Sequence, residues 1–282
     1  HKSHDVLKIQ IEMGIKSFKC STLREAEMAV DAGAEEIIMA YPVIHPLKLE
    51  RMAKLKGGHP KIDIKSIVST PQHLKVLSST MKENGLSMGV YMDLDTGMRR
   101  TGVQPGDDAK SFYTEIANTE SLNPVGLHVF DGEALYISSI YERETIINRN
   151  IRKFEDIWEY AEVNKIPFAD NLAGGSWSFS GYIGYPNIRV TPGTWIYWDT
   201  RNSEMSELNF KIASLILGQV VDFDAEMDTV TLDIGSKACS SDQPLEHRFK
   251  LIDFPDSELV QQSEEHGVVK LNGHSIKVGD FV

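Results

Sequence analysis

The sequence predicts an α/β fold, a (β/α)8 TIM-type barrel followed by a smaller C-terminal β-rich domain. Helical and strand-like segments alternate over the first two-thirds of the chain, and from about Asn209 short β-rich segments take over. At 282 residues the chain also exceeds the usual size of one small domain. We therefore expect a barrel in residues 1–205 and a second domain in residues 206–282.

Helix formers at helical spacing, with proline and glycine near several ends, predict six helices. They cover residues 5–13, 23–32, 46–56, 71–84, 107–118 and 142–164. Seven strand candidates accompany them, at residues 17–22, 36–42, 62–69, 86–95, 123–131, 168–173 and 188–198. Strands joined through helices imply a parallel sheet, and seven of them suit a barrel with one strand missing. A doubly wound sheet is disfavoured, because no Gly-x-Gly-x-x-Gly motif follows an early strand.

The remaining segments are short, rich in β-formers and separated by aspartate, glycine and proline. Residues 212–223, 229–234, 247–252 and 267–271 have this character. They predict antiparallel strands in a small second domain.

The composition and charge of the chain exclude some classes of binding partner. The formal net charge of −12, without a Lys/Arg cluster, argues against nucleic acid. No run of 18 apolar residues predicts a membrane span. Cys20 and Cys239 lie far apart in sequence and are expected to be reduced thiols, which suits a cytoplasmic protein.

Two glycine-containing loops could bind a phosphate group at the carboxyl ends of barrel strands, where active sites gather. In residues 174–179 (GGSWSF), glycines let the backbone approach a ligand, and Ser176 and Ser178 add hydroxyl donors. The N–H groups of Gly193 and Thr194 could complete the same site. The alternative for both loops is an ordinary turn.

Two other strand ends carry polar groups. Arg100 follows Asp93 and Asp95, and it either forms a buried Asp–Arg pair or orients an anionic group. His128 and Phe130 share one side of a strand end. The histidine is either a hydrogen-bonded core residue or a group that stacks on an aromatic cofactor.

Taken in order, these segments resemble the D-threonine aldolase/D-serine dehydratase family, which is related to alanine racemases of pyridoxal-phosphate fold type III. The matching segments are HKSH (1–4), STLREAE (21–27), AGAEEIIMAYPV (32–43), DLDTGMRRTGV (93–103), GLHVFDG (126–132), AGGSWSF (173–179), TPGTWIYWD (191–199), DIGSKACSSD (233–242) and SEEHG (263–267).

The resemblance implies a barrel with a β-rich domain and pyridoxal 5′-phosphate as cofactor. The Schiff-base lysine is expected two positions before His1, so Lys2 is not the cofactor lysine and no catalytic residue is assigned within the chain. A divalent metal, Zn or Mn/Mg, is expected with its ligands beyond Val282. On this reading the chain is cut at both ends.

The resemblance also assigns cofactor contacts to residues of this chain. Ser176, Gly193 and Thr194 match phosphate-binding positions, and His128 matches a position against the pyridine ring. Further ring contacts are assigned to Tyr136 and Arg100.

The implied function is a lyase that acts on D-β-hydroxy-α-amino acids, with D-threonine aldolase-like cleavage to glycine and an aldehyde. The alternatives are D-serine dehydratase-like β-elimination and amino-acid racemization. Racemases carry an arginine, facing the pyridine nitrogen, where this chain has Thr191, which favours the lyases. A non-catalytic pyridoxal-phosphate-binding protein and a barrel enzyme that binds another phosphate compound are further alternatives. By analogy, we expect a homodimer whose partner molecule is a D-amino acid.

Overall fold

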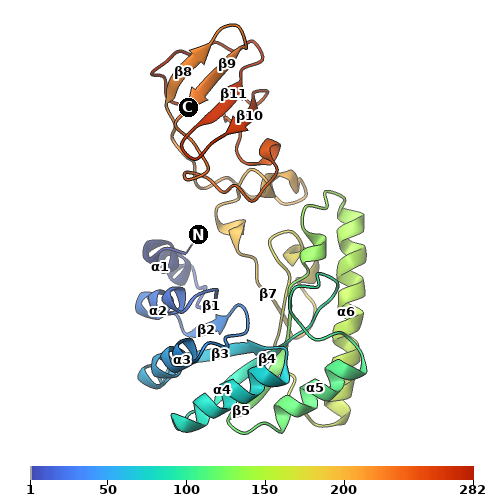
Figure 1. The fold of residues 1–282 in the computed structure, drawn as a ribbon. Helices are drawn as coiled ribbons and strands as arrows, with labels where there is room; N and C mark the ends of the chain where they lie inside the picture. Colours follow the sequence, from blue (N-terminus) through green and yellow to red (C-terminus); the bar gives the residue numbers. More distant parts are fainter. Residues whose placement is uncertain (1) are drawn as a thin grey trace. The chain divides into compact units, whose positions relative to one another are not determined.

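The computed structural model describes residues 2–282, which divide into two compact units (Figure 1). The first unit runs to Gly193 and the second covers Thr194–Val282. Residues 194–205, expected in the barrel, thus belong to the second compact unit. His1, which the resemblance relates to the cofactor-lysine motif, lies outside the described residues.

The first unit is built on one parallel sheet whose strands follow the chain order. Its strands are β1 (Ser17–Cys20), β2 (Glu36–Met39), β3 (Asp63–Val68), β4 (Met88–Asp93), β5 (Leu122–Val129), β6 (Asn171–Ala173) and β7 (Ile188–Val190). The predicted parallel α/β order is confirmed. The sheet is barrel-like but not a closed ring, because β1 and β7 do not pair within residues 2–282. Side chains nevertheless connect these two strands, since Arg189 Nη1 donates to Ser17 Oγ at 3.2 Å.

Six α-helices of residues 2–282 lie along the outside of the sheet; α1 precedes β1, and the other five each connect two consecutive strands (Figure 1). They are α1 (His4–Glu12), α2 (Leu23–Ala32), α3 (Pro46–Gly58), α4 (Pro71–Glu83), α5 (Asp107–Ala117) and α6 (Ile140–Val163). The hydroxyls of Ser3, Thr22, Thr70 and Ser139 accept a backbone N–H from the first turn of α1, α2, α4 and α6. These N-caps explain why the helix starts agree with the sequence pattern.

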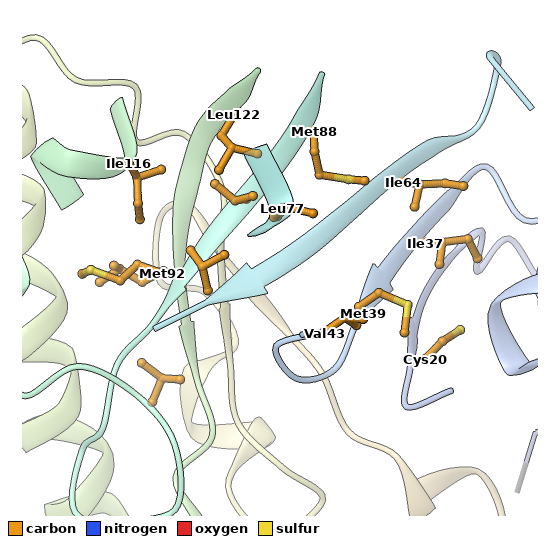
Figure 2. Packing of buried hydrophobic residues seen from close by; sticks show 14 of the residues in the cluster. Cys20, Ile37, Met39, Val43, Ile64, Leu77, Met88, Met92, Ile116 and Leu122 are labelled. Atoms are coloured by element: carbon orange, nitrogen blue, oxygen red, sulfur yellow. The ribbon is translucent and has the colours of Figure 1, made fainter. Parts of the chain in front are cut away.

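Alternate residues of each strand face opposite sides of the sheet. Cys20, Ile37, Met39 and Met92 all belong, together with helix residues, to the main apolar core (Figure 2). The alternate positions face inward, where Ile38, Ile67, Tyr91 and Leu172 form a separate small cluster. Polar residues at inward-facing positions near the strand ends therefore point to the inner side of the sheet.

A charged network ties the inner face together at the amino ends of several strands. Arg189 donates from Nε to Asp170 at 2.7 Å, from Nη1 to Glu36 at 2.6 Å and from Nη2 to the Tyr91 hydroxyl at 3.0 Å. Lys65 also pairs with Glu36. Burial alone would raise the pKa of Glu36, but hydrogen bonds from Arg189 and Lys65 outweigh it and lower the pKa to about 2.

The second unit has its own antiparallel sheet, in the order β10-β11-β9-β8, as predicted. Its strands are β8 (Val220–Asp224), β9 (Thr229–Leu232), β10 (Glu258–Gln262) and β11 (Gly267–Lys270). A separate core lies against this sheet, made by Val220, Val230, Leu232, Leu251, Val269 and Leu271.

Several predicted strands are wrong in extent. The strand expected over 188–198 ends at Val190, because Pro192 has no N–H to continue a ladder, and Thr194–Ile196 form a 3₁₀ turn. Residues 247–252 contain no strand. The strand Glu258–Gln262 was missed, since a register shift between Leu259 and Gln261 breaks the alternation that would reveal it. No helix of residues 2–282 has both the length and the apolar character needed to cross a bilayer.

Candidate active site

A hydrogen-bonded cluster joins four strand ends on the inner face of the first unit. Asp93 and His128 are register partners at the carboxyl ends of β4 and β5. Asp93 Oδ1 lies 2.6 Å from His128 Nδ1, and both residues are buried. His128 Nε2 lies 3.2 Å from Lys19 Nζ, which extends from β1. Lys19 also donates to Thr191 Oγ1 at 2.8 Å, directly after β7. The cluster thus links both edges of the sheet with its centre.

The partners determine where the protons lie. A carboxylate only accepts, so His128 Nδ1 carries a hydrogen toward Asp93, and Nε2 accepts from the Lys19 ammonium. Thr191 Oγ1 accepts from Lys19 and donates its own hydrogen to the Gly174 carbonyl at 3.0 Å. Burial and the adjacent Lys19 lower the pKa of His128 despite the opposing effect of Asp93. The imidazole is therefore neutral near pH 7.

The pKa of Lys19 is strongly perturbed. Burial lowers its pKa to about 8, against the attraction of Asp93, and the charges of Lys2 and Arg100 lower it further. Lys19 was not among the site residues predicted from the sequence. Its signal was a single lysine between Phe18 and Cys20, two apolar residues that face the opposite side of β1 and are buried.

Ser176 and Gly193 lie next to each other after β6 and β7. After β6 the chain turns at Gly174, whose φ of +77° lies in the left-handed region. A Cβ at Gly174 would stand 2.9 Å from the Cα of Phe179, so this turn needs glycine. Ser176 Oγ then accepts the N–H of Gly193 at 3.2 Å.

The second serine of this loop has a different role. Ser178 Oγ donates to Asp131 at 2.8 Å, so its hydrogen is not directed to a ligand, contrary to the prediction. Asp131 also accepts the hydroxyl of Tyr182 at 3.0 Å. Burial raises the pKa of Asp131. These bonds fix the shape of the loop that carries Ser176.

Arg100 does not form the buried Asp–Arg pair that was one alternative. Its guanidinium carbon lies 4.4 Å from the centroid of the Phe130 ring, a cation–π contact. Asp95 instead accepts the backbone N–H groups of Gly97 and Arg99, each at 3.0 Å. Asp95 therefore shapes its own loop.

The other two predicted contacts lie outside the hydrogen-bonded cluster. Tyr136 packs edge-on against Trp177, with ring centroids 5.5 Å apart. Thr194 begins the second unit, where its Oγ1 accepts from Asn202 Nδ2 at 2.8 Å. Cofactor contacts stay predictions for all six residues to which the resemblance assigns them, namely His128, Tyr136, Ser176, Gly193, Thr194 and Arg100. Within residues 2–282, no three His, Cys, Asp or Glu side chains form a metal-binding group, and the predicted metal site stays untested.

Comparisons with known proteins identify the family. Residues 1–200 match the model of the alanine racemase N-terminal domain, and residues 213–282 match that of a serine dehydratase domain. A 3-hydroxy-D-aspartate aldolase of Paracoccus denitrificans (strain Pd 1222) is 23% identical over 99% of this chain and 73% of its own length. The crystal structure of D-threonine aldolase from Filomicrobium marinum matches with a TM-score of 0.90 and 23% identity, over 100% of this chain and 75% of that one.

A dehydratase is also among the similar structures. D-threo-3-hydroxyaspartate dehydratase from Delftia sp. HT23 matches with a TM-score of 0.82 and 19% identity, over 99% of this chain and 79% of that one. Aldolases and dehydratases are lyases, so the prediction of an enzyme of this class is confirmed by its relatives. The chain belongs to the alanine racemase N-terminal domain family and, as predicted, to its D-threonine aldolase/D-serine dehydratase group.

Proposed function

We propose that this protein is a pyridoxal-phosphate-dependent lyase of D-β-hydroxy-α-amino acids that cleaves the Cα–Cβ bond, as a D-threonine aldolase does. The aldolase names of its relatives support the reaction. The observation that carries the proposal is the cluster of Lys19, His128 and Asp93 at the carboxyl ends of the strands, where enzymes of this architecture bind their ligands.

The residues present fit pyridoxal phosphate. Ser176 and Gly193, which the resemblance assigns to the phosphate, are adjacent, so both can contact one phosphate group. His128 offers a neutral, flat ring held rigidly by Asp93. Lys19 has three N–H donors and two hydrogen-bond partners within residues 2–282, so one donor remains for a ligand.

The chain's own residues bind and orient. When bound, pyridoxal phosphate supplies the electron sink for breaking a bond at Cα. Asp93 fixes the tautomer and the orientation of His128, so the imidazole cannot rotate away from a ligand ring. Gly174 allows the turn that brings Ser176 to Gly193. These groups are arranged before a ligand arrives, which reduces the cost of positioning it.

A dehydratase reaction is the second candidate. The Delftia enzyme and the dehydratase-type match of residues 213–282 favour it. It differs in which group leaves, because β-elimination releases the β-hydroxyl, whereas aldol cleavage releases an aldehyde. The predicted divalent metal would polarise that hydroxyl in either reaction. Racemization and a non-catalytic role have less support, because the relatives above are lyases.

Product analysis distinguishes these functions. Purified full-length protein with pyridoxal phosphate and Mn²⁺ or Zn²⁺ is incubated with D-threonine, D-threo-3-hydroxyaspartate or D-serine, and with L-threonine as the control. Glycine with an aldehyde supports the aldolase, and ammonia with a keto acid supports the dehydratase. Appearance of the L-enantiomer alone would indicate a racemase. Turnover of none of the D-substrates would contradict the proposal.

A further inference from the structure

We propose that Lys19 is a cofactor-binding residue whose amine donates a hydrogen bond to the ring nitrogen of pyridoxal phosphate. The inference rests on the proposed function and deepens it, because it assigns a role to a residue that no sequence pattern identified. The Lys19 amine, from edge strand β1, is held between His128 on the interior strand β5 and Thr191 directly after the other edge strand, β7.

The geometry leaves one N–H of Lys19 for a ligand. Nζ lies 3.2 Å from His128 Nε2 and 2.8 Å from Thr191 Oγ1, and both atoms accept. These are its only hydrogen-bond partners within the part of the chain that the structure describes. Lys19 is partly buried, and a further acceptor would satisfy its remaining donor, because an unsatisfied donor away from water is costly. The charged groups that act on it are Asp93 and Asp131, which attract it, and Lys2 and Arg100, which repel it.

The position of Thr191 indicates which acceptor that is. Thr191 precedes Gly193 by two residues, a span of about 7 Å in an extended chain. Gly193 and Ser176 form the predicted phosphate contact, so the Lys19 amine is bonded to a residue two positions from it. The cofactor's carbonyl must remain open to the amino-acid substrate. With that edge open, the opposite ring edge, which carries the nitrogen, would face Thr191 and Lys19.

This contact determines the state of the ring nitrogen. A cationic donor directed at the nitrogen favours its unprotonated, accepting form. His128 contributes indirectly, since its Nε2 orients the amine, and the Asp93 carboxylate keeps that nitrogen free to accept. Lys19 would therefore bind the cofactor and also favour the unprotonated form of its ring nitrogen.

The test compares two ligands on the full-length protein. Pyridoxal phosphate and its 1-deaza analogue, in which C–H replaces the ring nitrogen, are titrated against wild type, Lys19→Met and Lys19→Arg. Lys16→Met is the control, because Lys16 is exposed and pairs with Glu35. We expect wild type and Lys16→Met to prefer pyridoxal phosphate by about tenfold or more, as a charged hydrogen bond implies. In Lys19→Met this preference should fall below about twofold, while Lys19→Arg should retain part of it.

A spectroscopic readout complements the titration. With ¹⁵N at the ring nitrogen, the bound wild-type cofactor should give the chemical shift of an unprotonated, hydrogen-bonded pyridine, and Lys19→Met should change it. A pyridinium shift in wild type would overturn the inference even if Lys19→Met failed to fold. So would equal ligand preference in wild type and Lys19→Met, or a borohydride-reduced adduct on Lys19. Failure of wild type to bind pyridoxal phosphate at all would instead contradict the proposed function.

Discussion

Removing the Asp93 charge should lower the pKa of Lys19. Asp93 is the strongest group that raises this pKa against burial, which lowers it to about 8. The hydrogen-bonded path from the Asp93 carboxylate through the His128 ring to the Lys19 amine is about 8 Å long, so the two charges lie at most about 8 Å apart. Two unit charges at that separation interact by about 2 kcal/mol at an effective dielectric constant of about 20. This corresponds to about 1.5 pH units, so Asp93→Asn should bring the pKa of Lys19 to about 6.5.

The pKa is measured by ¹³C NMR titration of protein labelled at the lysine ε-carbon, with Lys19→Arg identifying the resonance. Asp95→Asn is the control, because Asp95 bonds to Gly97 and Arg99 in its own loop and is not among the groups that shift Lys19. We expect the control to leave the titration of Lys19 unchanged. A Lys19 pKa that stays near 8 or rises in Asp93→Asn would refute the electrostatic coupling through His128.

Three further predictions concern the stability of the first unit. Arg189→Leu should lower the free energy of unfolding, measured with denaturant, by about 2–3 kcal/mol, because it leaves the partly buried Glu36 and its neighbours without their main cation. Arg24 is exposed, so the control Arg24→Leu should lower it by less than about 1 kcal/mol. Equal losses in the two variants would contradict this prediction. Glu36, with its folded pKa lowered to about 2, contributes stability above its ordinary pKa of 4.5 that is lost as the pH falls from there toward 2. Glu36→Gln should flatten that part of the profile of unfolding midpoint against pH, and an unchanged slope would contradict the assignment. Gly174→Ala should lower the free energy of unfolding by about 2 kcal/mol or more, and Gly184→Ala by about 1 kcal/mol, both measured by thermal unfolding. Both glycines have positive φ, but only at Gly174 would a Cβ meet the backbone, so a reversed order would be inconsistent with this turn.

Local physical signals explain why much of the fold was predictable. The helix starts coincide with Ser, Thr and Pro residues that cap or open them, as at Thr22 and Pro71. The strands of the parallel sheet are short apolar runs between those helices, so their order followed from the connections. In the second unit, a register shift hid the strand Glu258–Gln262, and Pro192 ended β7 earlier than its apolar continuation suggested.

The candidate site was only partly predictable for a different reason. His128, Ser176 and Gly193 stood out because each belongs to a motif of the resemblance. The hydroxyl of Ser178 was wrongly expected to face a ligand, since its partner Asp131 is 47 positions away in sequence. No local pattern reports such a contact.

The sequence by itself determined the α/β class, the parallel order, the antiparallel second unit and the family, because periodicity, caps and motifs act over a few neighbouring residues. Only the tertiary structure decided which polar groups meet. Lys19 and Thr191 are 172 positions apart, yet the curled sheet brings their side chains within 2.8 Å. Burial then lowers the pKa of that lysine, and Asp93 fixes the proton on His128. Such pairings depend on how the sheet curls, and no residue encodes that locally.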